Sequence, residues 1–310
     1  MKTNGWVTEF LFLFCALSYA APVEPVKAHE DGVWKIAFSA EGDHFLTAGG
    51  DGVVKTWWTE CFCGLASFRH DSNFRVWDAA FFPDHRIVST SQDGSIYVWQ
   101  GETGEKVQKI EGHTLNAPRV RVLPDGSRFF TACSDGFVKA WDGKTYTELS
   151  SIKTKSPVGI VPLGGTPEHW LTVGLNGVLL WNLAEQKVER TFSESPYYFV
   201  SEPISPTQVL IGGNPSQGGP LQILDTEKKE IVQTFDSVPG FFWQVDASRD
   251  GKWIGASAYK SKAYVWERAT GKLVYSSDEK VGETISLSFF PEGRAIIIGG
   301  SDGTIQMARF

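Results

Sequence analysis

Hydrophobic and polar residues alternate along this chain in short runs that follow a fixed order. Between residues 29 and 57, a His is followed by two runs rich in Val, Ile, Phe and Trp, a turn at Asp51-Gly52, and a third run that ends at Trp57. Runs of this length, bounded by Gly, Asp, Pro and Ser, predict β-strands. Asp-Gly between two such runs predicts a hairpin, because its turn needs positive φ. The stretch therefore predicts a small antiparallel sheet.

The same order returns at residues 70–99 and 113–141, and weaker copies continue to the C-terminus. The closing residue of each copy recurs about every 40–45 residues, at Trp57, Trp99, Trp141, Trp181, Leu224, Trp266 and Ala308. A period of this length with an early His, a late Asp-Gly and a closing Trp is typical of the WD40 repeat. The chain resembles the WD40 repeat family over residues 21–310, by identity in three copies and by spacing in four.

This resemblance implies an all-β fold, a seven-bladed WD40 β-propeller formed as one domain by residues 21–310. A blade of four strands cannot bury both of its faces alone, so blades stack around an axis. The chain stops after the third strand of its last copy, and in the family an N-terminal segment commonly supplies the missing strand. We expect Ala21–Ala28 to supply it here, since Pro22 and Pro25 are tolerated at an outer edge.

In the family, His, Ser or Thr, Asp and Trp of one blade form a buried hydrogen-bonded tetrad. Carried over by position, the tetrads are His29, Thr47, Asp51 and Trp57; His70, Ser89, Asp93 and Trp99; and His113, Thr131, Asp135 and Trp141. These side chains can satisfy one another when buried. A Ser, His and Asp together also resemble a hydrolase triad. The recurrence at structural spacing favours the structural interpretation, and the other four blades are expected to rely on apolar packing.

Three Trp residues occupy one equivalent place near the start of the first strand of their copies. They are Trp34, Trp77 and Trp243, and Tyr197 lies near the matching place of the fifth copy. In the family this place opens onto the narrow face of the ring, as do the residues before the turn Asp, here Gln92, Ser134 and Ser301. Clustered exposed aromatic side chains are typical of binding sites. The alternative is that these Trp fill gaps between blades.

The net charge limits the class of partner that the protein can bind. The formal charge is -7 and the pI about 5.5, which disfavours general nucleic-acid binding. We therefore expect a non-catalytic scaffold for a protein or peptide, monomeric by itself, with no cofactor, no metal and no stable membrane insertion. Two alternatives remain: an exported enzyme of the metal-dependent hydrolase or lactonase type, with Asp78 and Asp246 as candidate carboxylates, and a carbohydrate-binding propeller that uses the Trp residues for stacking.

The N-terminal residues lie outside the repeat. An apolar run at residues 10–17 is followed by Ser18-Tyr19-Ala20, the layout of a secretory signal peptide over residues 1–20. This predicts export to a periplasm, a secretory lumen or the exterior; the alternative is a cytoplasmic protein whose N-terminus packs on the ring. Cys61, Cys63 and Cys133 would remain after cleavage, and export would permit a disulfide.

Overall fold

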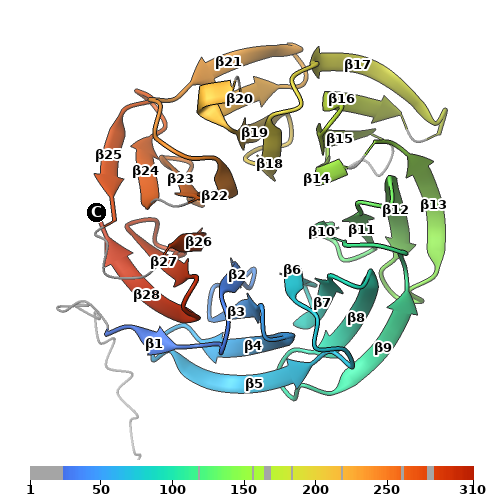
Figure 1. The fold of residues 1–310 in the computed structure, drawn as a ribbon, viewed down its shortest axis with the longest axis vertical. Helices are drawn as coiled ribbons and strands as arrows, with labels where there is room; N and C mark the ends of the chain where they lie inside the picture. The colour runs from blue at the N-terminus through green and yellow to red at the C-terminus, as the bar shows by residue number, and fades with distance from the viewer. Residues whose placement is uncertain are drawn as a thin grey trace, which may run out of the picture.

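The computed structural model describes residues 24–117, 119–155, 157–163, 169–182, 184–217, 219–259, 262–277 and 283–310. Seven four-stranded antiparallel sheets stand around a central channel, and the N-terminal β1 joins the sheet of the C-terminal strands (Figure 1). The predicted all-β fold of seven blades is confirmed. The predicted signal peptide, residues 1–20, lies outside the described residues.

In each blade the first strand is innermost. The first three blades consist of β2 (Val33–Phe38), β3 (His44–Gly49), β4 (Val53–Trp58) and β5 (Cys63–Arg69); β6 (Val76–Phe81), β7 (Arg86–Ser91), β8 (Ser95–Gln100) and β9 (Lys106–Glu111); and β10 (Arg119–Val122), β11 (Arg128–Ala132), β12 (Phe137–Asp142) and β13 (Glu148–Lys153). The next two consist of β14 (Pro157–Pro162), β15 (His169–Gly174), β16 (Gly177–Asn182) and β17 (Lys187–Ser193); and β18 (Tyr198–Pro203), β19 (Gln208–Gly213), β20 (Gln222–Asp225) and β21 (Glu230–Thr234). The last two consist of β22 (Phe242–Ala247), β23 (Trp253–Ala258), β24 (Ala263–Glu267) and β25 (Leu273–Ser276); and β26 (Thr284–Phe289), β27 (Ala295–Gly300) and β28 (Thr304–Arg309), completed by β1 (Val26–Lys27).

Ring closure joins the two ends of the described chain. Val26 pairs with Ile305 and Lys27 with Thr304, antiparallel, and the Lys27 ammonium donates to the carbonyl of Asp302 at 2.7 Å. The closing strand falls within the expected 21–28 segment. It covers part of β28, whose backbone would otherwise be an open edge.

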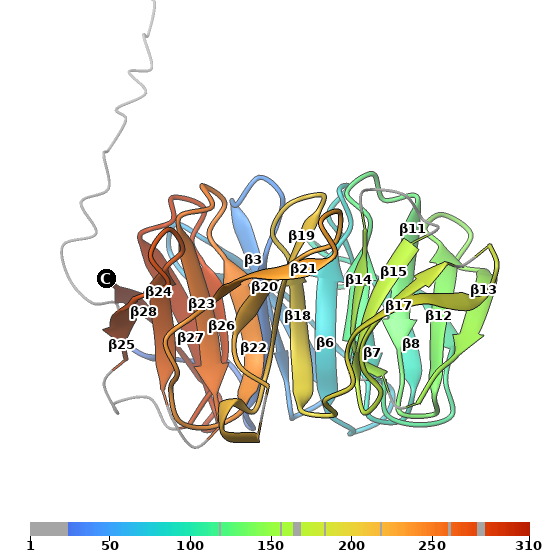
Figure 2. The same ribbon diagram turned by 90° about the horizontal axis from the view of Figure 1, so that it is seen from above.

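The Asp-Gly turns lie at one face of the ring, which we call the Asp-Gly face. Gly52 and Gly94 have φ of 78° and 84°, the left-handed region that the hairpin turn requires. A Cβ on Gly94 would also lie 2.4 Å from the carbonyl oxygen of His113. The turns between the first and second strands of each blade lie at the opposite face, as the side view shows (Figure 2).

The core is divided among the contacts between neighbouring blades. Each of the seven blade-to-blade interfaces in the described chain has its own cluster of buried apolar side chains. At the closure, Val33 and Phe45 of the first blade pack against Ile297 and Met307 of the last. In the part of the chain that the structure describes, no helix is both long and apolar enough for a membrane span; η1 (Pro215–Gln217) is the helical segment there.

Candidate binding site in the central channel

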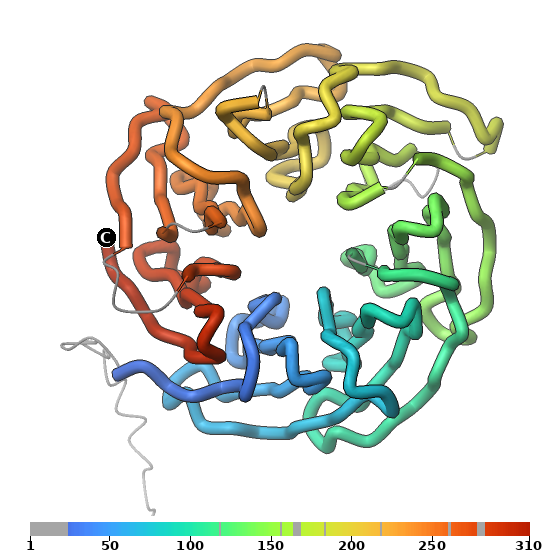
Figure 3. The backbone as a smooth tube through the Cα atoms, viewed as in Figure 1, coloured from blue at the N-terminus to red at the C-terminus, as the bar shows by residue number. Residues whose placement is uncertain are grey.

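Six innermost strands carry a β-bulge near their first residue. Val33 pairs with Gly49 and Lys35 with Ala48, so Trp34 is an extra residue in its strand. The same shift of register leaves as extra residues Trp77, Val158, Phe199, Trp243 and Ile285. A bulge takes a side chain out of the regular alternation and gives it a new direction. All six bulge residues line one cavity. The cavity lies in the central channel, around which the backbone of the seven blades runs (Figure 3).

The cavity is mostly apolar and has a volume of about 560 Å³. Binding sites for small ligands typically span roughly 300–1,000 Å³. Besides the bulge residues, it is lined by Asn116, Arg119, Ser134, Asn214, Gln217, Phe241 and Phe242. Arg119 is the single charged side chain among these described lining residues. The cavity is therefore an aromatic and aliphatic cup with one cationic group.

The three Trp side chains are in contact. The Trp34 ring lies 4.8 Å from that of Trp77 and 5.5 Å from that of Trp243, both edge to face, a favourable arrangement for aromatic rings. The Arg75 guanidinium lies over Trp34 and Trp77, at 5.3 and 5.9 Å from the ring centroids. Asp31 approaches Arg75 to 3.8 Å at the surface. The Trp faces therefore form part of a packed cluster that has the Arg75–Asp31 pair at its surface.

A buried ionic network lies next to this cavity in the channel. Asp78, which is 1% exposed, approaches Lys35 at 3.6 Å and Arg121 at 3.3 Å. Arg121 also pairs with Glu202 at 2.8 Å. These four residues belong to the first, second, third and fifth blades. The network therefore links neighbouring innermost strands and, through Arg121 and Glu202, the third and fifth blades, which are not neighbours in the ring.

The environments of Asp78 and Asp246 bear on the enzymatic alternative. Burial alone would raise the pKa of Asp78, but Lys35 and Arg121 outweigh it and hold that pKa below its usual range. Burial, with the nearby Glu202 charge, raises the pKa of Asp246 to about 6. Asp246 accepts hydrogen bonds from Ser288 Oγ and the Phe289 amide. Both carboxylates are engaged with protein groups, which favours a structural role for them.

Two of the three expected tetrads have their full set of contacts. In the first blade, His29 Nδ1 donates to Asp51 at 3.0 Å, Nε2 lies 2.8 Å from Thr47 Oγ1, and the Trp57 indole donates to the same hydroxyl at 3.0 Å. The third blade repeats these contacts with His113, Asp135, Thr131 and Trp141 at 2.7–3.0 Å. Each series of hydrogen bonds links the Asp-Gly turn to the third strand of its blade.

The second blade departs from the expected tetrad. His70 Nε2 contacts Ser89 Oγ at 2.8 Å, and the Trp99 indole donates to Ser89. The buried His70 Nδ1, however, has no hydrogen-bond partner among the residues that the structure describes. Asp93 instead accepts from the Ser72 hydroxyl at 2.7 Å. The expected bond between His70 and Asp93 was therefore wrong, because a nearer hydroxyl takes the carboxylate.

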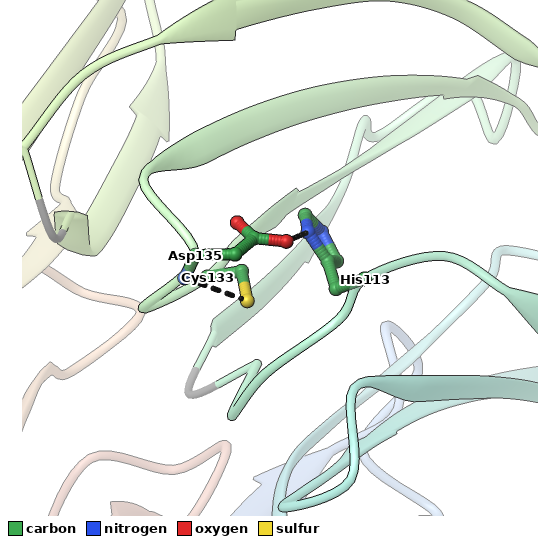
Figure 4. Close-up of side chains that lie close together, drawn as sticks. All are labelled: His113, Cys133 and Asp135. Carbon is green, nitrogen blue, oxygen red and sulfur yellow. Dashed lines mark hydrogen bonds and ion pairs between the residues drawn. The ribbon is translucent and has the colours of Figure 1, made fainter.

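In the third blade, Cys133 lies beside the tetrad residues His113 and Asp135 (Figure 4). One possible ligand atom from each lies within 4.8 Å of the others. However, His113 Nδ1 donates to Asp135, and the Asp135 amide donates to Cys133 Sγ at 3.3 Å. Burial raises the pKa of Cys133 to about 12, so the thiol keeps its proton, whereas a metal ligand is a thiolate. These contacts favour a structural role.

We expect His70 to make stability fall as the pH is lowered. Burial lowers the pKa of His70 to about 3, whereas an unfolded His titrates near 6.5. Below pH 6.5 the unfolded chain binds a proton that the folded chain excludes. The contribution of neutral His70 is thus complete above pH 6.5 and declines toward pH 3, by at most about 1.4 kcal/mol per pH unit.

The measurement is the free energy of unfolding at pH 7, 6 and 5 for the wild type and for His70→Gln. The variant should be less stable at pH 7 but have a smaller slope. Leu175→Ala, at an exposed site with no titratable group, is the control and should keep the wild-type slope. Equal slopes for His70→Gln and the wild type would contradict the assignment.

The remaining residues predicted for the binding site are divided between the cavity and the surface around it. Ser134 lines the cavity, whereas Gln92, Tyr197 and Ser301 are exposed and lie outside its lining. Sequence reasoning missed Arg119, Phe199 and Phe241. Phe199 could have been found, because it precedes the regular part of its strand in the same way as Trp34. The sequence signal for Arg119 was weak, because it consisted only of two Arg residues separated by one position in a short strand.

Cys61 and Cys63 form a disulfide, and Cys133 is free and buried. The disulfide joins Cys61, in the turn after the third strand of the first blade, to Cys63, the first residue of its fourth strand, β5. It therefore belongs to the face opposite the cavity.

Comparisons with known proteins agree with this geometry. Residues 21–57, 64–100 and 104–142 match the family model described as WD domain, G-beta repeat. Protein tipD of Dictyostelium discoideum is 25% identical over 258 residues, 79% of this chain and 41% of tipD. Pre-mRNA-splicing factor cwf17 of Schizosaccharomyces pombe is 24% identical over 322 residues, 98% of this chain and 92% of cwf17. Protein groucho of Drosophila melanogaster is 33% identical over 100 residues, 31% of this chain and 13% of groucho.

The chain thus spans less than half of tipD and nearly all of cwf17. The matched repeats are the three with a His, a hydroxyl, an Asp and a Trp, while four further blades complete the same ring. The chain belongs to the WD40 repeat family, whose seven-bladed propellers are typically non-catalytic scaffolds for protein interaction.

Proposed function

We propose that this propeller binds a protein or peptide partner on its Asp-Gly face, with the channel cavity at the centre of the interface. The observation that carries the proposal is the ring of bulge residues, in which Trp34, Trp77 and Trp243 surround a cavity of about 560 Å³. Binding hot spots are enriched in Trp and Arg and concentrate in pockets near the interface centre. Arg75 and Arg119 supply the second residue type.

The names of the relatives support a general scaffold rather than a particular partner. They include a pre-mRNA-splicing factor, a telomerase protein component and a cilia- and flagella-associated protein. The feature that these proteins share with this chain is the repeat. A sugar-binding role is less favoured, since Arg75 lies over the faces of Trp34 and Trp77 on which a sugar ring would stack.

The test is site-specific photo-crosslinking of the full chain in its source cells. A photoreactive amino acid at Gln92 or Ser301 samples the Asp-Gly face, and one at Asp84 or Asp125 samples the opposite face. We expect a discrete protein adduct from the first pair. The Trp34→Ala/Trp77→Ala double variant should reduce it at least about tenfold, because truncating two hot-spot residues costs more than about 1.4 kcal/mol of binding free energy.

Trp58→Ala is the control for loss of an indole side chain, because Trp58 is exposed (44%), whereas Trp34 and Trp77 are partly buried, and it ends β4 toward the opposite face. The control should leave the adduct unchanged. Adducts that form only from Asp84 or Asp125, or that survive the double Trp variant, would contradict the proposed face.

We also propose that the chain is exported. The support is the apolar run at residues 10–17 followed by small residues, together with the disulfide between Cys61 and Cys63, a bond that persists in oxidising compartments. The intact mass of the native protein tests this. A chain that begins near residue 21 outside the cytoplasm is expected, and a cytoplasmic chain that begins at Met1 would exclude export.

A further inference from the structure

The chemistry of the cavity indicates which kind of group enters it. Its walls are aromatic and aliphatic, so the entering group must have a large apolar part. Arg119 is the single charge among the described lining residues, and no carboxylate is among them. A second cation, Arg75, lies over the rings of Trp34 and Trp77 at the rim of the cavity. The charge in the cavity wall is therefore positive, whereas Arg75 at the rim is paired with Asp31.

Two indole donors beside the cavity act in the same direction. The N–H groups of Trp34 and Trp77 are buried and have no acceptor within the part of the chain that the structure describes. They add to the positive potential of the guanidinium groups instead of offsetting it. Asn116 also lines the cavity, and its buried Oδ1 is an acceptor that has no donor among the described residues. An ammonium or a methylated lysine would meet donors and a like charge here.

The neighbouring carboxylates do not reverse this balance. Asp78 pairs with Lys35 and Arg121, and Glu202 pairs with Arg121. Burial lowers the pKa of Arg119, against the pull of Asp78, but from a value far above neutrality, so the guanidinium keeps its charge. One Arg119 nitrogen donates to the carbonyl of Trp243 at 3.0 Å, which holds the side chain at the aromatic wall. Asp31, at the rim, faces Arg75 in a largely solvated pair.

We infer that the cavity binds a peptide segment of the partner that carries a bulky apolar side chain directly beside a carboxylate. This rests on the proposed function and specifies its ligand. The apolar side chain fills the ring of bulge residues, and the carboxylate, which accepts hydrogen bonds only, pairs with Arg119. The carboxylate can belong to an Asp or Glu side chain or to the C-terminus of the partner.

The test uses the full chain and two bead libraries of random octapeptides, one ending in a free carboxylate and one in a carboxamide. Binding peptides are sequenced, and those that also bind Trp34→Ala are removed. We expect enrichment of Phe, Trp, Leu or Met next to Asp or Glu. If the partner uses its C-terminus, the apolar residue will be terminal and enriched in the free-carboxylate library alone.

A selected peptide is then compared with an uncharged twin of the same sequence. In the twin, Gln replaces Glu, or a carboxamide replaces the terminal carboxylate. The wild-type protein should bind the uncharged twin at least about tenfold more weakly, since a hydrogen bond to a charged group contributes more than one to a neutral group. Arg119→Gln should bind both peptides equally, whereas Arg119→Lys should retain part of the preference. The comparison of twins on the wild type needs no variant to fold.

The outcomes separate this inference from the proposed function. Peptides that depend on Trp34 but show no acidic preference, or prefer Lys or Arg, would overturn the inference and leave the binding face in place. If every binding peptide also binds Trp34→Ala, so that none is left after this removal, both would be overturned. No enrichment from either library would overturn the inference, while the crosslinking experiment would still decide the face.

Discussion

Replacing Asp78 with Ala is expected to lower the free energy of unfolding by about 3–5 kcal/mol. The substitution leaves Lys35 and Arg121, which are mostly buried, without the carboxylate that faces both at 3.6 and 3.3 Å. It also removes the acceptor of the Val120 amide at 3.1 Å. Removing one partner of a buried ionic pair is costly because the remaining charge stays desolvated. Equilibrium unfolding in urea at pH 7.5, followed by Trp fluorescence, measures the loss.

Two variants test the reason for that loss. Glu292→Ala removes an exposed carboxylate and should stay within about 0.5 kcal/mol of the wild type. Asp78→Leu combined with Lys35→Met removes both members of one pair and leaves Arg121 paired with Glu202. It should be more stable than Asp78→Ala alone, because apolar replacements of a buried pair can be nearly neutral. If Asp78→Ala costs less than 1 kcal/mol, water in the channel solvates the network and the ionic explanation is wrong.

The periodicity of the sequence predicts the number of blades, the turn positions and the closing strand. Each of these follows from local patterns, such as the Asp-Gly turns and the repeated closing Trp. The alignment of Trp34, Trp77 and Trp243 likewise predicts that three aromatic residues share one level of the ring. Their roles in binding remain predictions.

The ionic network was not predictable in the same way. Arg121 and Glu202 lie 81 residues apart in blades that are not neighbours, so no local pattern relates them. The bulges depend on strand register, which periodicity does not resolve to one residue.

The second tetrad shows how one residue can change a repeated motif. Four residues after the turn Asp, the first and third blades have Lys55 and Lys139, whereas the second has Tyr97. The Tyr97 ring lies 4.2 Å from that of His70, and its hydroxyl contacts the Asp71 amide at 3.3 Å. The corresponding amide in the first blade, that of Glu30, donates to the turn Asp instead. The substitution by Tyr was a visible signal that the second tetrad differs.

Replacing Trp266 with Ala is expected to cost about 3–5 kcal/mol, a typical loss for a large buried aromatic side chain. The sixth blade has no His for a tetrad, and the Trp266 indole donates instead to the carbonyl of Asp236 at 3.0 Å. The side chain is fully buried and packs with Phe235 and Phe242 at the interface with the fifth blade. The substitution therefore opens a cavity between two blades and leaves the Asp236 carbonyl without this donor.

Comparison with two further variants identifies the source of the loss. Trp58→Ala, at an exposed site, should cost less than about 1 kcal/mol. Trp266→Phe keeps most of the apolar volume and loses the hydrogen bond, so it should cost less than Trp266→Ala but more than Trp58→Ala. The three free energies of unfolding are measured in urea at one pH. If Trp266→Ala is no more destabilising than Trp58→Ala, apolar packing does not hold the fifth and sixth blades together, and the hydrogen bonds between them must.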